Sequence, residues 1–281
     1  MYFDAHNHLQ DEWLAPHRAQ VFADLAAAGV HRVVANGTSE SDWAAVEALA
    51  AETALTLPSF GLHPWDAGNR SSAWLEKLRG HLDANPSAGV GEIGLDRWIL
   101  DRARPDDPRL KGLRRAPLEE QTEVFLAQLE LAAQRNLPAS IHCLDAFGPL
   151  YDLLRREKLP ARGFLLHAYS GPAEMVAGFA KLGAYFSFNG AFLDPRKQRL
   201  RDLYAVIPAD RLLVETDAPA MRLPADREKF PPLLAADGSP ANHPANVAVT
   251  YSALAALRAT PLDSLAAQVE KNFRRLFTLS F

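Results

Sequence analysis

The chain has 281 residues, of which 48% are hydrophobic and 23% charged, a mixture typical of a folded globular protein rather than a disordered one. Its net charge of -4 excludes an overall attraction to nucleic acid or to anionic membranes, so a polyanion would need a local binding feature. The single cysteine, Cys143, excludes an intrachain disulfide. Because we find neither a basic, apolar leader nor a membrane-spanning stretch, we expect a cytoplasmic protein without membrane contacts.

Eight short apolar, β-branched or aromatic runs recur along the chain, with longer amphipathic stretches between them. We predict strands at Tyr2–Ala5, Val30–Asn36, Thr56–Leu62, Gly89–Gly94, Ala139–Cys143, Phe164–Ala168, Ala184–Asn189 and Leu212–Thr216. Apolar spacing predicts helices most clearly at Glu40–Ala51, Leu118–Arg135, Ala173–Leu182, Pro244–Leu257 and Leu262–Phe277. This alternation indicates an α/β protein, and eight units close most simply as a (β/α)8 TIM barrel, a single domain over residues 1–281.

Two stretches do not fit the alternation, and we predict that both are loops. Asp96–Pro117 is rich in arginine and proline, but its interleaved aspartates make a self-neutralising surface as plausible as a phosphate-binding one. Pro219–Pro244 is rich in proline, aspartate and glycine. Both follow strand ends, where barrel enzymes place their sites.

Ionisable residues end several of the predicted strands. His6 and His8 lie two residues apart, so both imidazoles can reach one metal ion, although such a pair is equally typical of surface histidines. Four more residues end other strands: Glu92, His142, His167 and Asp217. Ionisable groups are rarely buried without partners, so the joint pattern predicts that all six converge at one rim of the barrel.

Four imidazoles with two carboxylates suit a pair of divalent cations, one carboxylate bridging them. Two such cations can hold a hydroxide at neutral pH, which indicates hydrolysis. The ligand types admit zinc, magnesium or manganese.

His63, after the third strand, is predicted to contact the substrate. Glu215 shares a face with Asp217, where it either orients a ligand or is a salt-bridged core carboxylate.

Other polar residues have simpler interpretations. The remaining histidines lack a partner at ligand spacing and are predicted to be solvated or capping residues: His17, His31, His81 and His243. The basic run from Arg196 to Arg201 is typical of a solvated helix face, with phosphate positioning as the alternative.

Several motifs, in order, make the chain resemble the TatD family of metal-dependent hydrolases. They are Asp4-Ala-His-Asn-His-Leu, Gly61-Leu-His-Pro, Gly91-Glu-Ile-Gly-Leu-Asp, Leu166-His-Ala-Tyr-Ser-Gly, Val214-Glu-Thr-Asp-Ala-Pro and Asn272-Phe-Arg-Arg-Leu-Phe. The resemblance implies one divalent ion held by His6, His8, Glu92 and Asp217. It implies a second ion held by Glu92, His142 and His167, with Glu92 bridging the two.

The resemblance also implies a deoxyribonuclease that cleaves phosphodiester bonds. We expect its substrate to be single-stranded DNA or another phosphodiester, and the sequence does not indicate an obligate protein partner. Asp217 would accept the proton of the attacking hydroxide, Glu92 would bridge the ions, and His63 would position the phosphate. Two alternatives stay open. Because fold does not fix function, the chain could be an amide, ester or lactone hydrolase of the wider amidohydrolase type, or a non-catalytic metal-binding scaffold. The stretch Arg97–Pro117 is longer than the family's usual connection.

Overall fold

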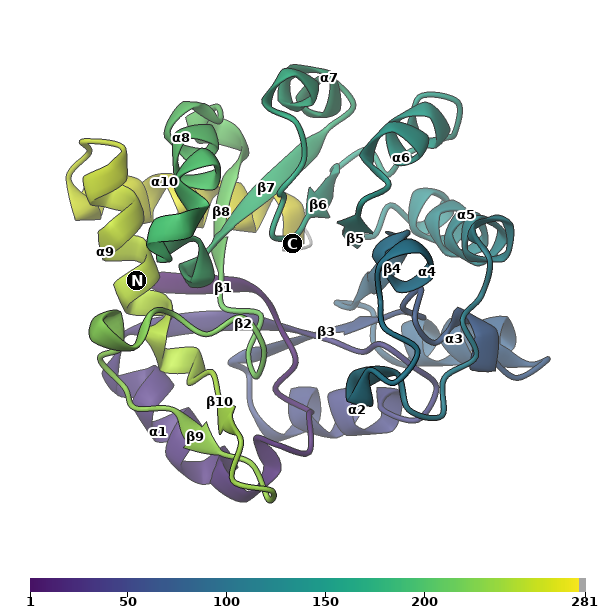
Figure 1. The fold of residues 1–281 in the computed structure, drawn as a ribbon, viewed down its shortest axis with the longest axis horizontal. Coiled ribbons are helices and arrows are strands. Elements are labelled where there is room, and N and C mark those ends of the chain that lie inside the picture. The colour runs from purple at the N-terminus through teal and green to yellow at the C-terminus, as the bar shows by residue number, and fades with distance from the viewer. Residues whose placement is uncertain (278–281) are drawn as a thin grey trace. The chain divides into compact units, whose positions relative to one another are not determined.

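The structure is a computed structural model that describes residues 1–277. Its main sheet has eight parallel strands in the order β1 to β8, alternating with helices, which confirms the predicted (β/α)8 barrel fold (Figure 1). The strands are β1 (Tyr2–Asn7), β2 (Val30–Asn36), β3 (Thr56–Phe60), β4 (Gly89–Asp96), β5 (Ala139–Leu144), β6 (Phe164–Leu166), β7 (Ala184–Asn189) and β8 (Leu212–Glu215). The helices are α1 (Arg18–Ala27), α2 (Trp43–Glu52), α3 (Trp74–Ala84), α4 (Trp98–Asp101), α5 (Leu118–Arg135), α6 (Phe147–Leu154), α7 (Val176–Lys181), α8 (Gln198–Val206), α9 (Val247–Leu257) and α10 (Leu262–Phe277).

The chain divides into two compact units. Among the described residues, the terminal unit comprises residues 1–35, 48–57 and 185–277, and it contains β1, β8 and almost all of β2 and β7. The central unit comprises residues 36–47 and 58–184, with β4, β5, β6 and most of β3. That residues 1–281 form a single domain stays a prediction.

In the terminal unit, the last helix packs on the strands that carry the chain's first and last polar motifs. α9 and α10 contact β1 and β8 (Figure 1). The buried face of α10 repeats every three or four positions, as an amphipathic helix requires: Leu265, Ala266, Val269, Phe273, Leu276 and Phe277. The buried Asn272 donates from Nδ2 to Leu212 O at 2.8 Å and to Ala209 O at 2.7 Å, which fixes α10 to the start of β8.

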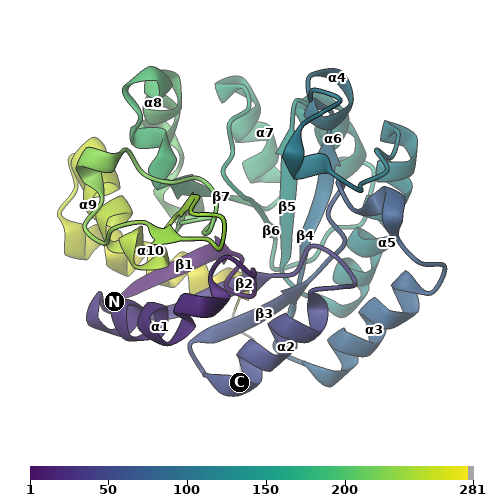
Figure 2. The same ribbon diagram turned by 60° about the horizontal axis from the view of Figure 1, so that its bottom comes forward.

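In the central unit, α5 packs on β4, and its buried amides complete the hydrogen bonding of strand ends (Figure 2). Gln121 accepts from Asp96 N at 2.8 Å and donates to Asp96 O at 3.1 Å. Gln128 does the same for Leu62, accepting at 2.7 Å and donating at 3.1 Å. Because a buried, unpaired backbone group is costly, these glutamines allow strands to end inside the protein, beside polar side chains.

The carboxyl-terminal half of β4 lies unusually close to β5. Gly94 has a φ of 150°, and a Cβ at this position would lie 1.9 Å from His142 O. Only glycine permits this approach. It places the polar side chains at the ends of β4 and β5 next to each other.

Most predicted elements are present, with differences at their ends. β2, β7, α5 and α10 have the predicted bounds. β1, β4 and β5 extend further than predicted, whereas β3, β6 and β8 end earlier, and α2 begins at Trp43 rather than Glu40. The helix predicted at Ala173–Leu182 is a short 3-10 turn followed by α7, and that predicted at Pro244–Leu257 is a 3-10 turn followed by α9.

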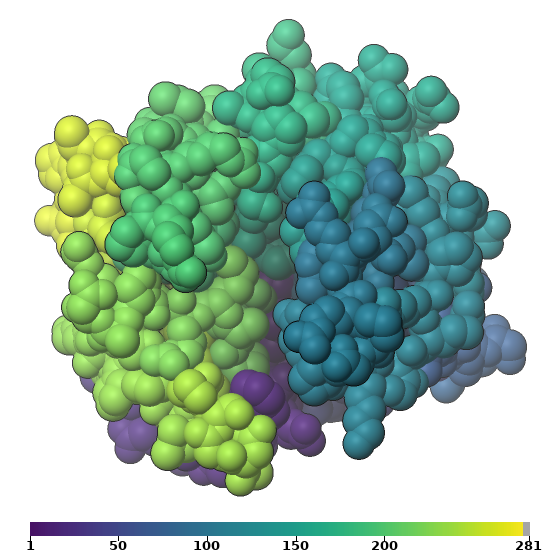
Figure 3. Space-filling model, viewed as in Figure 1, coloured from purple at the N-terminus to yellow at the C-terminus, as the bar shows by residue number. Residues whose placement is uncertain are grey.

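The stretch Asp96–Pro117 is not the plain loop that we predicted. Asp96 belongs to β4, and α4 and a 3-10 turn at Pro108–Leu110 follow it. Three buried residues of the stretch form a small apolar cluster: Ile99, Ala103 and Leu110. In Figure 3 the blue-teal atoms around α4 stand toward the viewer. This cluster could not be recognised from the sequence pattern, because its few apolar residues lie among arginines and aspartates.

The stretch Pro219–Pro244 also contains regular structure, contrary to the prediction. β9 (Leu233–Leu234) and β10 (Pro240–Ala241) form a short antiparallel pair. The hairpin is tied to the chain before α1 by a hydrogen bond between His17 Nε2 and Leu234 O at 2.8 Å.

No helix within residues 1–277 is long and apolar enough to cross a membrane.

Candidate metal centre

In the terminal unit, the structure brings together His6, His8 and Asp217. We call these three residues the terminal cluster. Asp217 Oδ1 lies 3.3 Å from His8 Nε2 and 3.6 Å from His6 Nε2, and one potential ligand atom of each residue lies within 4.8 Å of the others. Asp217 has a φ of 53°, a region that aspartate enters more readily than most residues. Its backbone N–H donates to His6 O at 2.9 Å, so β1 and β8 are joined at the cluster.

Asp4 holds the backbone that carries this cluster. Its Oδ1 accepts from the N–H groups of His6 at 3.3 Å and Thr216 at 3.0 Å. Its Oδ2 accepts from Asn7 Nδ2 at 3.1 Å and Thr216 Oγ1 at 2.5 Å. Burial raises the pKa of Asp4 to about 7, although these hydrogen bonds act in the opposite direction. Asp4 had no predicted role, although its position two residues before His6 on a strand was a usable signal.

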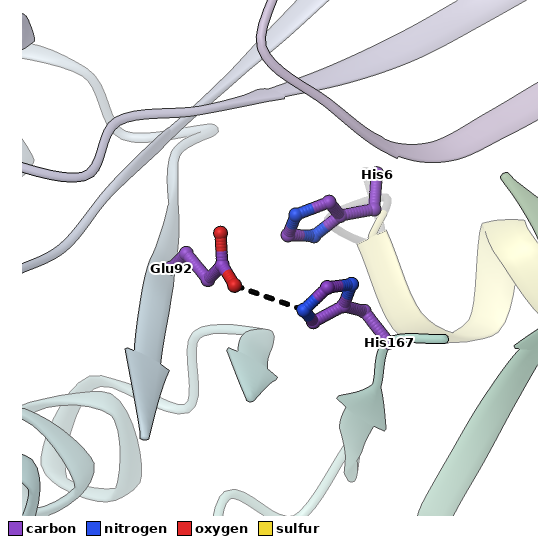
Figure 4. Close-up of side chains that lie close together, drawn as sticks. All are labelled: His6, Glu92 and His167. Atoms are coloured by element: carbon purple, nitrogen blue, oxygen red, sulfur yellow. Dashed lines mark ion pairs between the residues drawn. The ribbon is translucent and has the colours of Figure 1, made fainter. Parts of the chain in front are cut away.

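In the central unit, three imidazoles surround one oxygen of Glu92. We call Glu92, His63, His142 and His167 the central cluster. Glu92 Oε1 lies 2.9 Å from His167 Nε2, the contact drawn in Figure 4, 3.0 Å from His142 Nδ1 and 3.4 Å from His63 Nε2. The two nitrogens nearest to Glu92 are themselves 3.3 Å apart. Such convergent nitrogen and oxygen donors suit a divalent cation.

Asp96, which had no predicted role, fixes the ring of His142. His142 Nε2 lies 3.2 Å from Asp96 Oδ2, which also accepts from Trp65 Nε1 at 2.6 Å. Although burial lowers the pKa of His142, hydrogen bonds with Asp96 and Glu92 raise it to about 9. With Nε2 engaged by Asp96, the ring points Nδ1 at Glu92, as in the carboxylate–histidine pairs of metal sites. Asp96 follows Glu92 by four residues on one strand, so strand periodicity could have identified it.

His63 lies in the central cluster in a defined tautomeric form. Its Nδ1 accepts from the backbone N–H of Trp65 at 3.2 Å, which leaves the ring proton on Nε2, directed at Glu92. Burial lowers the pKa of His63, an effect that the nearby Glu92 carboxylate partly offsets. A neutral His63 is therefore a hydrogen-bond donor at neutral pH.

Glu215 is a core residue. It is fully buried, and its carboxylate accepts from Ser187 Oγ at 2.5 Å and Asn189 Nδ2 at 3.2 Å. Its carboxylate is thus bound by a hydroxyl and an amide within the strand layer, as a core carboxylate.

His243 is not solvated, which corrects part of the prediction. It is 3% exposed, its Nε2 lies 3.2 Å from Asp24 Oδ2, and its Nδ1 accepts from Ala245 N at 3.2 Å. The predicted capping role is confirmed for this residue, because the Ala245 N–H begins a helical turn.

The basic run after β7 is occupied by contacts within the chain. Arg196 pairs with Asp194 at 2.6 Å and is exposed. Arg201 donates from Nη1 to Phe192 O at 2.9 Å and also binds Asp194 O. These bonds favour a structural role for both arginines over phosphate positioning.

Both clusters offer imidazole nitrogens and a carboxylate oxygen within ligand reach of one another, so their donor sets fit divalent cations. A cation in such a setting activates water and polarises a phosphoryl or carbonyl oxygen. The arrangement therefore suits metal-assisted hydrolysis, whichever bond is cut.

Comparison with known proteins identifies similar chains. A family model described as "TatD related DNase" matches residues 3–278. Over 280 residues the chain is 30% identical to the "Uncharacterized metal-dependent hydrolase YjjV" of Escherichia coli K12, covering 99% of this chain and 98% of the relative. It is 32% identical to the "3'-5' ssDNA/RNA exonuclease TatD" of Escherichia fergusonii, with 99% and 100% covered.

Solved structures show the same fold. The crystal structure of YjjV, a TatD homolog from Escherichia coli K12, superposes with a TM-score of 0.83 at 30% identity and covers 99% of this chain and 98% of that one. A TatD family hydrolase from Entamoeba histolytica superposes with a TM-score of 0.80 at 16% identity, covering 99% and 98%, which speaks for the fold alone.

Proposed function

Because this chain belongs to the family of TatD-related DNases and is a metal-dependent hydrolase, we propose that it hydrolyses phosphodiester bonds of single-stranded DNA. The name of a relative at 32% identity, a single-strand exonuclease, supports this substrate. The observation that carries the proposal is the convergence of imidazoles and carboxylates in the two clusters.

The proposal assigns one divalent ion to each cluster. His6, His8 and Asp217 would hold the first, and Glu92, His142 and His167 would hold the second. That Glu92 also binds the first ion stays a prediction, as do the identity of the ions as zinc, magnesium or manganese, the cytoplasmic location and the lack of an obligate protein partner. The imidazoles of both donor sets suit zinc, and their carboxylates suit magnesium or manganese.

Two side chains would act on the reacting groups, and a third would orient two imidazoles. When bound, the ions supply an activated water and neutralise charge on the phosphoryl oxygens. Asp217, with a side chain 11% exposed, takes up the proton of the attacking water. His63 donates from Nε2 to a phosphoryl oxygen, and Glu92 keeps the imidazoles of His142 and His167 oriented.

A metal-reconstitution assay tests this proposal. The purified protein is stripped with a chelator, its metal content is measured, and activity is followed after addition of zinc, manganese or magnesium. We expect cleavage of a single-stranded oligodeoxynucleotide that is lost on stripping and restored by at least one ion. Cleavage only of lactones, esters or amides would replace the nuclease by the wider amidohydrolase activity. A metal-loaded protein inactive on every substrate would favour the scaffold hypothesis.

A further inference from the structure

The segment of residues 97–115, which we call the basic cap, differs in charge from the rest of the chain. It carries seven basic residues, Arg97, Arg102, Arg104, Arg109, Lys111, Arg114 and Arg115, against three aspartates, Asp101, Asp106 and Asp107, which gives it a net charge of +4. The whole chain has a net charge of -4. Within the cap, Arg97, Arg104 and Arg109 pair with its three aspartates, and Arg102 and Arg114 pair with Asp145 and Glu120. The basic cap is therefore a local excess of positive charge, part of it paired, at which a polyanion can bind an otherwise acidic protein.

The basic cap is a folded element with an apolar core of its own. Its apolar cluster of Ile99, Ala103 and Leu110 is buried, and the partly buried Trp65 and Trp98 pack against it. Arg115 donates to three carbonyl oxygens of the cap, those of Ile99 and Ala103 at 3.2 Å and of Arg104 at 2.6 Å. These contacts join the two ends of the cap and hold its backbone together.

Two tryptophans and an arginine of this region form a stack. The rings of Trp65 and Trp98 lie 6.0 Å apart at an interplanar angle of 23°. The Arg109 guanidinium lies over both rings, 4.7 Å from the centre of Trp98 and 5.8 Å from that of Trp65. Asp107 holds it there with hydrogen bonds of 2.6 and 2.9 Å, while 59% of the Arg109 side chain stays exposed.

The stack is connected directly to the central cluster. Trp65 Nε1 donates to Asp96 Oδ2, and the same oxygen lies 3.2 Å from His142 Nε2. His142 in turn contacts Glu92 at 3.0 Å. A strand whose phosphate lies at the central cluster has its neighbouring nucleotides within reach of the basic cap.

We propose that Trp98 and Arg109 form a stacking surface for a base of the single-stranded substrate next to the scissile phosphate. The inference rests on the proposed function. Aromatic rings and guanidinium planes stack on unpaired bases of any sequence, and the positive charge of the cap attracts the phosphates on either side. The basic cap thereby selects polymeric strands over small phosphodiesters.

A pair of substitutions at Trp98 separates stacking from packing. Trp98→Phe keeps an aromatic face, whereas Trp98→Leu keeps an apolar side chain against Ile99 and Leu110 without one. Activity is measured on an oligothymidylate and on methyl 4-nitrophenyl phosphate, a diester without a base. We expect Trp98→Leu to reduce kcat/KM for the oligonucleotide, mainly through KM, about tenfold more than for the small diester, and Trp98→Phe to reduce it much less.

Equal effects of the two Trp98 variants, or equal effects on the two substrates, would overturn the stacking surface. If the wild-type protein cleaves neither diester, the proposed function fails instead. The stacking surface is then still tested by fluorescence anisotropy of a labelled oligothymidylate, using Asp217→Asn protein with and without Trp98→Leu. Weaker binding with the second substitution supports the surface, and unchanged binding contradicts it.

Arg109→Ala supplies an independent check. We expect it to weaken oligonucleotide binding and to make binding less dependent on salt, because a cation beside the strand is lost. The matched control is Arg79→Ala, which removes an exposed arginine from α3 and the same unit of charge. Equal losses in both variants would mean that only net charge matters, and the surface would be refuted.

Discussion

Asp4 in the terminal unit and Asp96 in the central unit both support a histidine of a cluster, but they hold different parts of it. Asp4 binds backbone N–H groups of β1 and of the residue after β8, so it determines the course of the chain. Asp96 binds the imidazole of His142 itself, so it determines the direction of a ligand atom. We therefore expect substitutions of Asp4 to lower the stability of the fold, and substitutions of Asp96 to lower metal affinity.

The largest effect is expected from Glu92→Ala. It leaves three imidazoles of the central cluster without the oxygen on which they converge, and it removes the carboxylate of that cluster, a proposed metal ligand. We expect a loss of activity of about a thousandfold or more, together with lower metal content, measured by elemental analysis. Glu123→Ala, at an exposed position on α5, is the control. Wild-type hydrolysis in Glu92→Ala would refute the site.

Asp217→Asn tests the terminal cluster with little change of shape. The amide keeps the volume but loses the charge and the ability to accept a proton. We expect kcat to fall about 100-fold to 10,000-fold while the midpoint of thermal unfolding changes little. A variant that unfolds readily but retains kcat when folded would show that Asp217 serves the fold alone.

Asp96→Asn tests the support of the His142 ring. The second carboxylate near this imidazole is lost, so we expect metal affinity to fall about 10-fold to 100-fold with little loss of stability. In metal-free protein, the pKa of His142 should fall below its value of about 9, because Asp96 no longer stabilises the protonated ring. An NMR titration checks this shift. Unchanged metal affinity would remove the distinction between the two supports.

Asp4→Ala tests the backbone support. Several buried donors lose their acceptor, so we expect the free energy of unfolding to fall by about 3 kcal/mol. Asp4→Asn retains one acceptor oxygen and should lose less. Chemical denaturation measures both. The folded fraction of Asp4→Ala should still bind metal; a variant of full stability that binds no metal would reverse the comparison.

A further prediction concerns pH and Asp66, which lies outside both clusters. Burial, with repulsion from Asp42, raises the pKa of Asp66 from 3.8 to about 7. The unfolded chain therefore releases this proton at lower pH than the folded chain does, and Asp66 costs stability progressively as pH rises from about 4 to 7. Asp66→Asn should match the wild type near pH 4 and be the more stable of the two above pH 7. A difference in the free energy of unfolding between Asp66→Asn and the wild type that stays the same at every pH would contradict this.

The alternation of apolar runs and amphipathic stretches was enough to predict the eight strands, because buried parallel strands and their covering helices have distinct apolar periods. It failed at strand ends. Apolar character stops before His6, yet β1 continues to Asn7, because backbone pairing does not depend on apolar side chains. The prediction of a loop at Asp96–Pro117 was wrong for a related reason, because the apolar core of the basic cap consists of few residues.

Residues with metal-binding chemistry were visible in the sequence at strand ends, and the structure groups His6 with His8 and Asp217, and Glu92 with His142 and His167. The carboxylates that support these residues, Asp4 and Asp96, could not be recognised in the same way. Asp4 bonds to Thr216, 212 positions away, and Asp96 bonds to His142, 46 positions away. A carboxylate near a ligand does not indicate which distant group it binds.

Asn272 on α10 also has a consequence for synthesis on the ribosome. The central unit contains no residue beyond 184, whereas the terminal unit joins β1 to α10, whose Asn272 donates to Leu212 O at the start of β8. The residues of the central unit are therefore synthesised before those of β8 and α10, and His6 and His8 can meet Asp217 only after that residue has left the ribosome. We expect the hydrolase to stay inactive until α10 has been synthesised.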